Sequence, residues 1–139
     1  MPVIDINMFA VLAAAIVNMV IGFIWYSPAV FGNTWMKASG ITEKKIQESK
    51  KEGMVKKFFL AFLGTLVMSY VLAHFIDYAG ATTLSAGAQA GLWLWLGFIA
   101  PVLLGGVLWE GKSYLSYSIN VLHYLAALVI MSMILAVWV

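Results

Sequence analysis

The chain has 139 residues, of which 63% are hydrophobic and 10% charged, and its formal net charge is +2. A water-soluble domain carries roughly 25% charged residues because its surface must face water. The composition therefore excludes a soluble globular protein, and it also excludes nucleic-acid binding through a basic face. The absence of cysteine excludes disulfides and thiolate chemistry. We expect one integral membrane domain over residues 1–139.

Four segments are long and apolar enough to cross a bilayer, which takes about 20 residues of a helix. They are residues 8–26, 58–76, 88–109 and 119–138. Each span must satisfy its own backbone groups in lipid, so the sequence predicts an all-α bundle of four membrane helices. The flank of the first span contains Asp5 and no basic residue, and no small-residue cleavage site follows it. We therefore expect a retained helix and not a cleaved signal peptide.

The lysines predict the orientation of the bundle. Residues 37–57 contain seven lysines and three glutamates, whereas residues 77–89 contain one aspartate and no basic residue. The positive-inside rule then places the lysine-rich loop between the first and second spans in the cytoplasm. Both termini consequently fall on the outer side. We expect a multi-pass protein of the bacterial cytoplasmic (inner) membrane, with the lipid bilayer as its surroundings.

The lysine-rich loop also contains a predicted short helix. Thr42 is suited to cap its start, and Gly53 is suited to end it. As an alternative, the second span begins near Ser49, because Ser49 and Glu52 have the spacing of a capping box.

Small residues recur every fourth position in the spans, which lets helix backbones approach closely. We expect the small faces of the first and second spans to meet, and Pro101 to kink the third span because it lacks a backbone donor. Four short spans bury little area, so we also expect a homo-oligomer, most simply a homodimer. The small positions are Ala10, Ala14, Asn18 and Gly22, then Ala61, Thr65, Ser69 and Ala73, then Gly87 and Gly91.

Polar residues gather near the predicted cytoplasmic ends of the spans and form a candidate pocket. Ser116, Asn120 and His123 share one helical face by their spacing. Glu110 is expected at a similar depth, where a hydrogen bond to His123 would raise the proton affinity of the imidazole. Intramembrane ionisable residues are functional candidates, although a structural interhelical role for His123 is the alternative. The candidate pocket comprises Tyr26, Ser27, Trp35, Glu110, Asn120 and His123.

A second cluster, His74, Asp77 and Tyr78, is predicted near the outer end of the second span, where i, i+3 and i+4 spacing lets these residues touch. His74 and His123 are expected about 18 Å apart in depth, too far to share a metal ion. Two histidines without cysteine make a weak metal site. We expect no metal and no cofactor, and we leave open whether each histidine is functional or structural.

No constellation of acid, base and nucleophile is visible, so we expect no enzymatic activity. The first functional hypothesis is a transporter, channel or carrier subunit for a small molecule, ion or lipid. The alternative is a non-catalytic membrane scaffold or accessory protein that acts through helix packing and the basic loop.

The stretch Trp25-Tyr26-Ser27-Pro28, followed by Phe31-Gly32 and Trp35, resembles the signature of the domain of unknown function 1761. The resemblance implies a small, mainly bacterial membrane protein with four spans, and it implies no activity. Physically, Pro28 should end the first helix and Gly32 should allow a tight reversal. We expect an aromatic hook that folds against the ends of the bundle, either as a lid over the candidate pocket or as an anchor at the interface. Other matching positions are His74, Trp95-Leu96-Gly97-Phe98, Trp109-Glu110 and Asn120.

Overall fold

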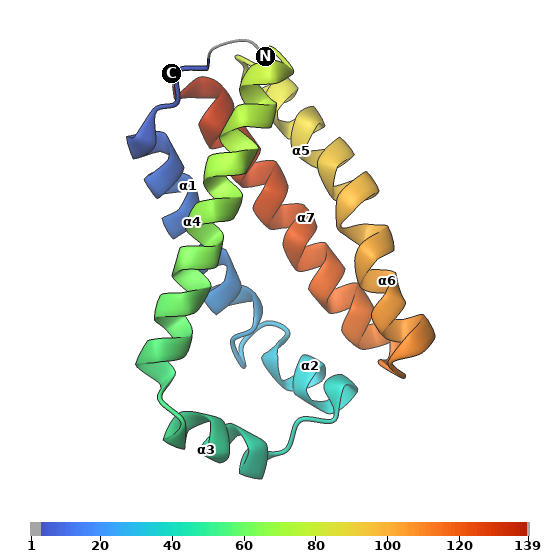
Figure 1. The fold of residues 1–139 in the computed structure, drawn as a ribbon. Coiled ribbons are helices and arrows are strands. Elements are labelled where there is room, and N and C mark those ends of the chain that lie inside the picture. Colours follow the sequence, from blue (N-terminus) through green and yellow to red (C-terminus); the bar gives the residue numbers. More distant parts are fainter. Residues whose placement is uncertain (1–3, 139) are drawn as a thin grey trace.

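The structure is a computed structural model, and it describes residues 4–138. Over this range the chain is all-helical, with no strand. Figure 1 shows the seven helices in chain order. They are α1 (Met8–Trp25), α2 (Gly32–Ser39), α3 (Glu43–Lys51), α4 (Met54–Tyr78), α5 (Leu84–Phe98), α6 (Ala100–Trp109) and α7 (Tyr114–Val137).

Four spans are long and apolar enough to cross a membrane, and they are α1, α4, the α5–α6 pair and α7. Three of the four spans begin earlier than the apolar segments of the sequence, whereas α1 begins at the predicted residue and ends one residue short. The second span begins at Met54 and ends at Tyr78, and the last begins at Tyr114. Both termini lie at one end of the bundle, which we call the terminal end (Figure 1). The short helices α2 and α3 lie at the opposite, lysine-rich end.

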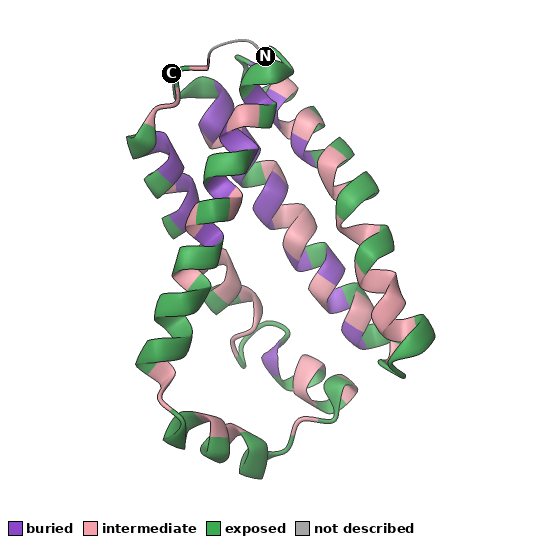
Figure 2. Ribbon diagram, viewed as in Figure 1, coloured by how far each residue is buried: buried purple, intermediate pink, exposed green. Residues whose placement is uncertain are grey.

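Helix α7 is the centre of the fold. In an apolar stretch of 18 residues within α7, 44% of the residues are buried inside the protein. In the corresponding stretch of the α5–α6 span, the buried share is 6%. Figure 2 shows the same contrast, with buried segments along α7 and none on α6. The core consists of small and apolar residues from α1, α4 and α7, among which Val11 and Met131 are the largest fully buried apolar side chains.

The small faces of α1 and α4 meet, as the sequence predicted. Asn18 Nδ2 donates to Thr65 Oγ1 at 3.2 Å, and Ser69 Oγ donates to the Val11 carbonyl at 2.8 Å. Both bonds are buried, and such polar links hold helices together where water is absent. The contact does not run the whole length, because Ala61 is exposed at the lysine-rich end of α4.

The GxxxG pair of α5 packs inside the chain, against α7. A Cβ placed on Gly87 would lie 2.7 Å from the Ser132 carbonyl oxygen, and one on Gly91 would lie 2.7 Å from the Leu128 carbonyl oxygen. Only glycine fits so close to a backbone. These two residues therefore pack within the protomer.

The third span breaks where Pro101 predicts a kink. Helix α5 ends at Phe98, and α6 starts at Ala100 with the proline in its first turn. Pro101 has no amide hydrogen to donate to the preceding turn. Beyond the break, the Tyr117 hydroxyl donates to the Ala100 carbonyl at 2.7 Å and holds α6 against α7.

The lysine-rich segment forms α3, and Thr42 caps it by accepting a hydrogen bond from the Lys45 amide. The alternative start of the second span at Ser49 is wrong. Ser49 lies inside α3, and α4 begins after Gly53, whose φ of +101° marks the turn between the two helices.

Candidate functional site

The segment between α1 and α2 makes a tight reversal. Helix α1 ends at Trp25, ahead of Pro28, and the amide of Gly32 donates to the Ser27 carbonyl at 2.9 Å. A Cβ on Gly32 would overlap the carbonyl oxygens of Tyr26 and Ser27, so this position requires glycine. The predicted hook exists, and its second arm is the helix α2, which sequence reasoning did not anticipate as a helix.

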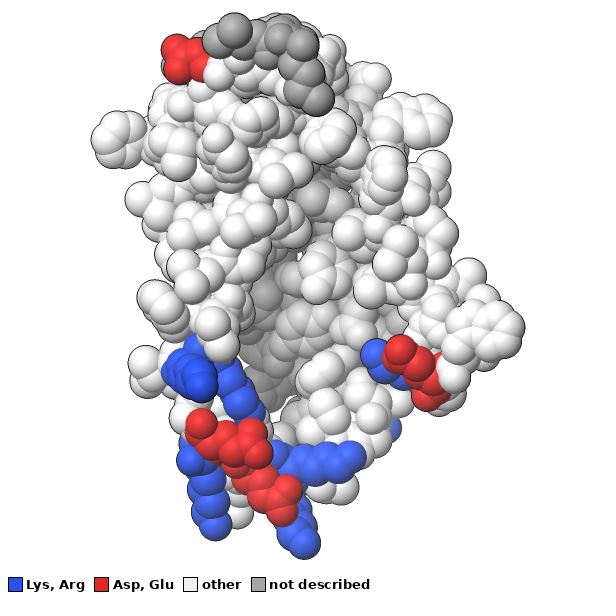
Figure 3. Space-filling view, in the orientation of Figure 1, with Lys and Arg blue, Asp and Glu red and all other residues white. Residues whose placement is uncertain are grey.

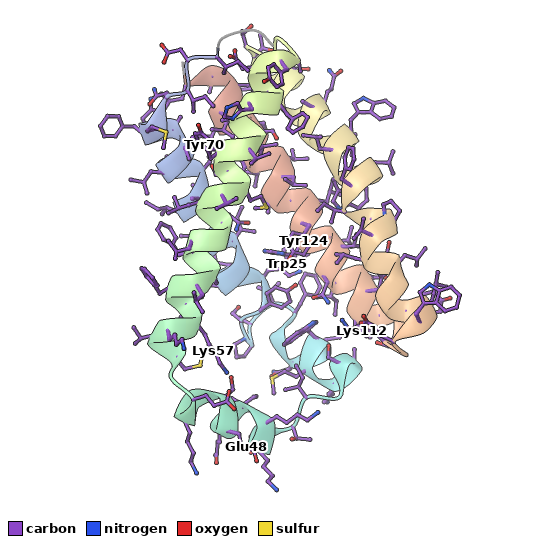
Figure 4. The ribbon with its side chains drawn as sticks, viewed as in Figure 1. Trp25, Glu48, Lys57, Tyr70, Lys112 and Tyr124 are labelled. Carbon is purple, nitrogen blue, oxygen red and sulfur yellow. The ribbon has the colours of Figure 1, made fainter. Side chains whose placement is uncertain are left out.

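Two aromatic side chains attach this reversal to α7. Trp25 Nε1 donates to the Ile119 carbonyl at 3.0 Å, and the Tyr26 hydroxyl donates to Asn120 Oδ1 at 2.6 Å. Figure 4 shows Trp25 reaching from α1 toward α7. Tyr26 follows the last residue of α1, and burial, with a smaller effect from Tyr124, raises the pKa of its phenol to about 12. The phenol therefore stays protonated and remains the donor at neutral pH.

Helix α2 adds two further links to the start of α7. Ser113 Oγ donates to the Ala38 carbonyl at 2.9 Å, and the hydroxyls of Ser39 and Ser116 lie 2.8 Å apart. The hook is thus held across the lysine-rich end of α7 by side chains from both arms. Ser39 and Ser113 carry no motif, and only the folded arrangement identifies them.

Four of the six residues of the candidate pocket come together. The ring of Tyr26 lies 5.1 Å from that of Trp35 and 5.3 Å from that of His123, and Tyr26 bonds to Asn120. Ser27 does not join them, because its hydroxyl donates to the Ile24 carbonyl in the last turn of α1.

The expected bond between Glu110 and His123 is not formed. Glu110 pairs with Lys112 at 3.3 Å, two residues along the chain. Its carboxylate lines a polar cavity of about 590 Å³ at the lysine-rich end, together with Trp35, Ser116 and Asn120. Glu110 therefore shares a cavity with part of the candidate pocket but does not reach the imidazole.

His123 is enclosed by aromatic rings. It is 7% exposed, and its ring centroid lies 5.0 Å from that of Tyr124 and 6.2 Å from that of Trp25. Within residues 4–138 neither of its ring nitrogens has a hydrogen-bond partner. His123 is not among the residues that line the polar cavity.

The second cluster is only partly assembled. His74 Nδ1 lies 2.9 Å from the Tyr70 carbonyl oxygen, which accepts its hydrogen bond, and the rings of His74 and Tyr78 are 6.4 Å apart. Asp77 instead lines a cavity of about 510 Å³ at the terminal end, beside Asp5. Among the described residues, no group of three histidine, aspartate or glutamate side chains could hold a metal ion.

Sequence reasoning missed the two apolar hollows beside α4. The first, which we call the α3 cavity, has about 660 Å³ and lies between α2, α3 and α4. The second, the α4–α5 groove, has about 260 Å³ and opens between α4 and α5, with Leu128 of α7 in its wall. Figure 3 shows the surface hollowed beside the lysine-bearing segment. The α3 cavity is lined in part by Tyr26, Trp35, Lys45, Lys50, Met54 and Phe58.

Residues 9–136 match the family described as "Protein of unknown function (DUF1761)". The match covers nearly the whole chain, and the protein belongs to this family. The function of this family is unknown, and this member has four helices able to span a membrane. No curated protein and no solved structure matches the chain.

Proposed function

We propose that this protein is a carrier subunit for a lipid-like amphiphile in the bacterial inner membrane. The observation that carries the proposal is the exposure of the lysine-rich half of α4, which contributes no residue to the core. Buried residues of α4 begin only at Thr65, and the turns before it are largely exposed (Figure 2). The α3 cavity and the α4–α5 groove lie on the flanks of this helix at different depths.

The shape of these hollows favours an amphiphile over an ion. The groove is lined by Met68, Phe75, Leu94 and other apolar side chains, and the walls of the α3 cavity are mostly apolar. The polar cavities lie at the two ends of the bundle, and between them the core contains Met131. Two apolar hollows on the side of the bundle suit a molecule that keeps its chain in hydrocarbon.

The proposal includes an orientation and an assembly. The lysine-rich end faces the cytoplasm and both termini lie on the outer side, in keeping with the positive-inside rule. The protein works as a homodimer or higher homo-oligomer and catalyses no reaction. Only 6% of the residues in the apolar stretch of the α5–α6 span are buried inside the protein. This supports the assembly, because most of the apolar surface of the span is available for a second copy.

Liposomes test the carrier function. Protein reconstituted with a fluorescent phosphatidylcholine analogue should move the probe between leaflets faster than protein-free liposomes do. Val71→Trp fills the α4–α5 groove and should slow the movement. Val67→Trp is the matched control, because Val67 is on the same helix, 64% exposed and outside the groove. Native protein that moves no probe would contradict the carrier function.

The second candidate is the membrane scaffold, and the exposed face of the α5–α6 span supports it. Leu92, Trp93 and Phe98 are all exposed there. Crosslinking in native membranes from a cysteine at Trp93 would favour the scaffold if it recovered another protein. Crosslinks only to other copies of this chain would agree with the homo-oligomer and count against the scaffold.

A further inference from the structure

We propose that the α3 cavity binds an anionic phospholipid of the surrounding leaflet, with an acyl chain against Met54 and Phe58 and the headgroup phosphate at Lys45 and Lys50. This inference rests on the proposed carrier function and names the ligand class of one of its two hollows. It goes further because it requires selectivity for negative charge, which a carrier of amphiphiles does not need.

The sequence of α3 builds this arrangement. Lys45, Ile46, Ser49 and Lys50 lie at i, i+1, i+4 and i+5, so they share one face of the helix, and all four line the cavity. Helix α4 supplies Met54 and Phe58 from the other side. The cavity therefore combines an apolar wall with two exposed lysines of α3 at its edge. Its volume of about 660 Å³ lies within the usual range of roughly 300–1,000 Å³ for ligand sites.

The two lysines are not neutralised by the protein. Lys57 pairs with Glu52 at 3.1 Å, and Lys112 pairs with Glu110. Over residues 4–138, Lys45 and Lys50 form neither an ion pair nor a side-chain hydrogen bond, and no acidic residue lines the α3 cavity. The complement of two free cations beside apolar walls is an amphiphile with a negative head.

Trp35 supplies a second and independent observation. Trp35 lines both this cavity and the polar cavity, and its Nε1 is buried without a hydrogen-bond partner in the described part of the chain. An indole nitrogen can only donate, and a buried donor needs an acceptor. Nε1 has no exposed surface, so it reaches a phosphate or ester oxygen of the bound lipid only when the indole turns toward the α3 cavity.

Native mass spectrometry of the full chain tests the inference. The protein is ejected from nanodiscs of phosphatidylcholine that contain a minor fraction of phosphatidylglycerol, and the retained lipids are counted. We expect the native protein to retain phosphatidylglycerol preferentially. Lys45→Gln with Lys50→Gln should lower its affinity for that lipid about tenfold, because these two lysines alone lose their direct charge-assisted contacts with the headgroup phosphate in the cavity.

The matched control is Lys44→Gln with Lys51→Gln. These lysines are on the same helix and outside the cavity, so the control removes the same charge without touching the site. It should leave retention unchanged. Equal loss in both double variants, or loss in neither, would overturn the inference.

Trp35→Phe removes the indole donor and keeps a ring in the wall, so it should also weaken phosphatidylglycerol retention. Retention equal to that of native protein would contradict the role of Nε1. Retention of both lipids in proportion to their abundance would overturn the headgroup selectivity and leave the carrier function standing. Native protein that retains no lipid and moves none in liposomes would overturn both.

Discussion

The Tyr26 hydroxyl donates a 2.6 Å hydrogen bond to Asn120 Oδ1 and so joins the reversal after α1 to a helix 94 residues further along the chain. Tyr26→Phe removes this bond and keeps the ring in place. We expect the free energy of unfolding to fall by about 1 kcal/mol, the usual contribution of one such bond. Denaturant titration in mild detergent, followed by circular dichroism, measures the change.

Ser27→Ala is the control for that substitution, since the Ser27 hydroxyl bonds only within its own turn. It should change stability by less than Tyr26→Phe does. Combining Tyr26→Phe with Asn120→Ala should cost less than the sum of the single effects, because both remove the same bond. Fully additive losses would show that the two side chains do not act together.

Gly91 of α5 and Gly64 of α4 differ in whether they tolerate a side chain. Gly91→Ala places a methyl group 2.7 Å from the Leu128 carbonyl and should destabilise the protein by about 1–3 kcal/mol, the range for overpacking. Gly64→Ala on α4 meets nothing within 4 Å and should be neutral or stabilising, because alanine favours helix. Thermal unfolding followed by size-exclusion chromatography compares them. Equal melting temperatures would contradict the packing of α5 on α7.

His123→Phe separates a structural histidine from a functional one. Neither ring nitrogen has a partner within the described chain, so the substitution breaks no hydrogen bond and fills a similar volume among aromatic rings. We expect stability to stay the same or to rise, by up to about 1–3 kcal/mol, since the substitution removes a buried polar group that has no partner. Asn120→Leu, which leaves the Tyr26 hydroxyl unpaired, is the sensitive comparison. A large loss in His123→Phe alone would mean that the imidazole has a partner in the membrane.

Lys57 connects α3 to α4 by contacting Ser49 Oγ at 2.5 Å and Glu52 at 3.1 Å. Both ends of the ion pair are substantially exposed, so Lys57→Gln should change global stability by less than about 1 kcal/mol. It should nevertheless speed hydrogen exchange of the α3 amides, because the tether between the helices is lost. Lys56→Gln, one residue earlier, is the control, and equal exchange in both variants would argue against the tether.

The orientation is testable because the natural sequence contains no cysteine. A single cysteine at Lys51 should react with a membrane-impermeant maleimide only after the inner membrane is opened. A single cysteine at Thr82, in the turn between α4 and α5, should react in intact spheroplasts. The reverse pattern would place the lysine-rich end outside.

The sequence predicted the spans well, because a membrane helix is specified by composition along its length. Their ends were predicted less well. Lys56 and Lys57 belong to α4 although they are charged, since hydropathy marks the apolar part of a helix and not its hydrogen-bonded limits. Thr42 was correctly assigned as a cap because capping depends on residues close in sequence.

The candidate site was harder to predict, because the depth of a residue along a membrane helix does not determine which way its side chain points around the helix axis. Glu110 and His123 were expected at similar depth, yet Glu110 pairs with Lys112, which is close in sequence and free to reach it. Tyr26, Trp35, Asn120 and His123 did come together, since each lies near the reversal imposed by Pro28 and Gly32. The α3 cavity was invisible in the sequence, because it depends on how α2, α3 and α4 are placed relative to one another.

The central position of α7 also sets an order for biogenesis. Of the four spans, α7 leaves the ribosome last, yet it provides the acceptors for Trp25, Tyr26 and Trp95. Until then, α1 and α4 can pair through their own buried hydrogen bonds, while the indole donors and the glycine face of α5 have no partner helix. We therefore expect the nascent protein to hold α1 and α4 as a helical hairpin beside an undocked α5–α6 span until synthesis of the final helix completes the assembly.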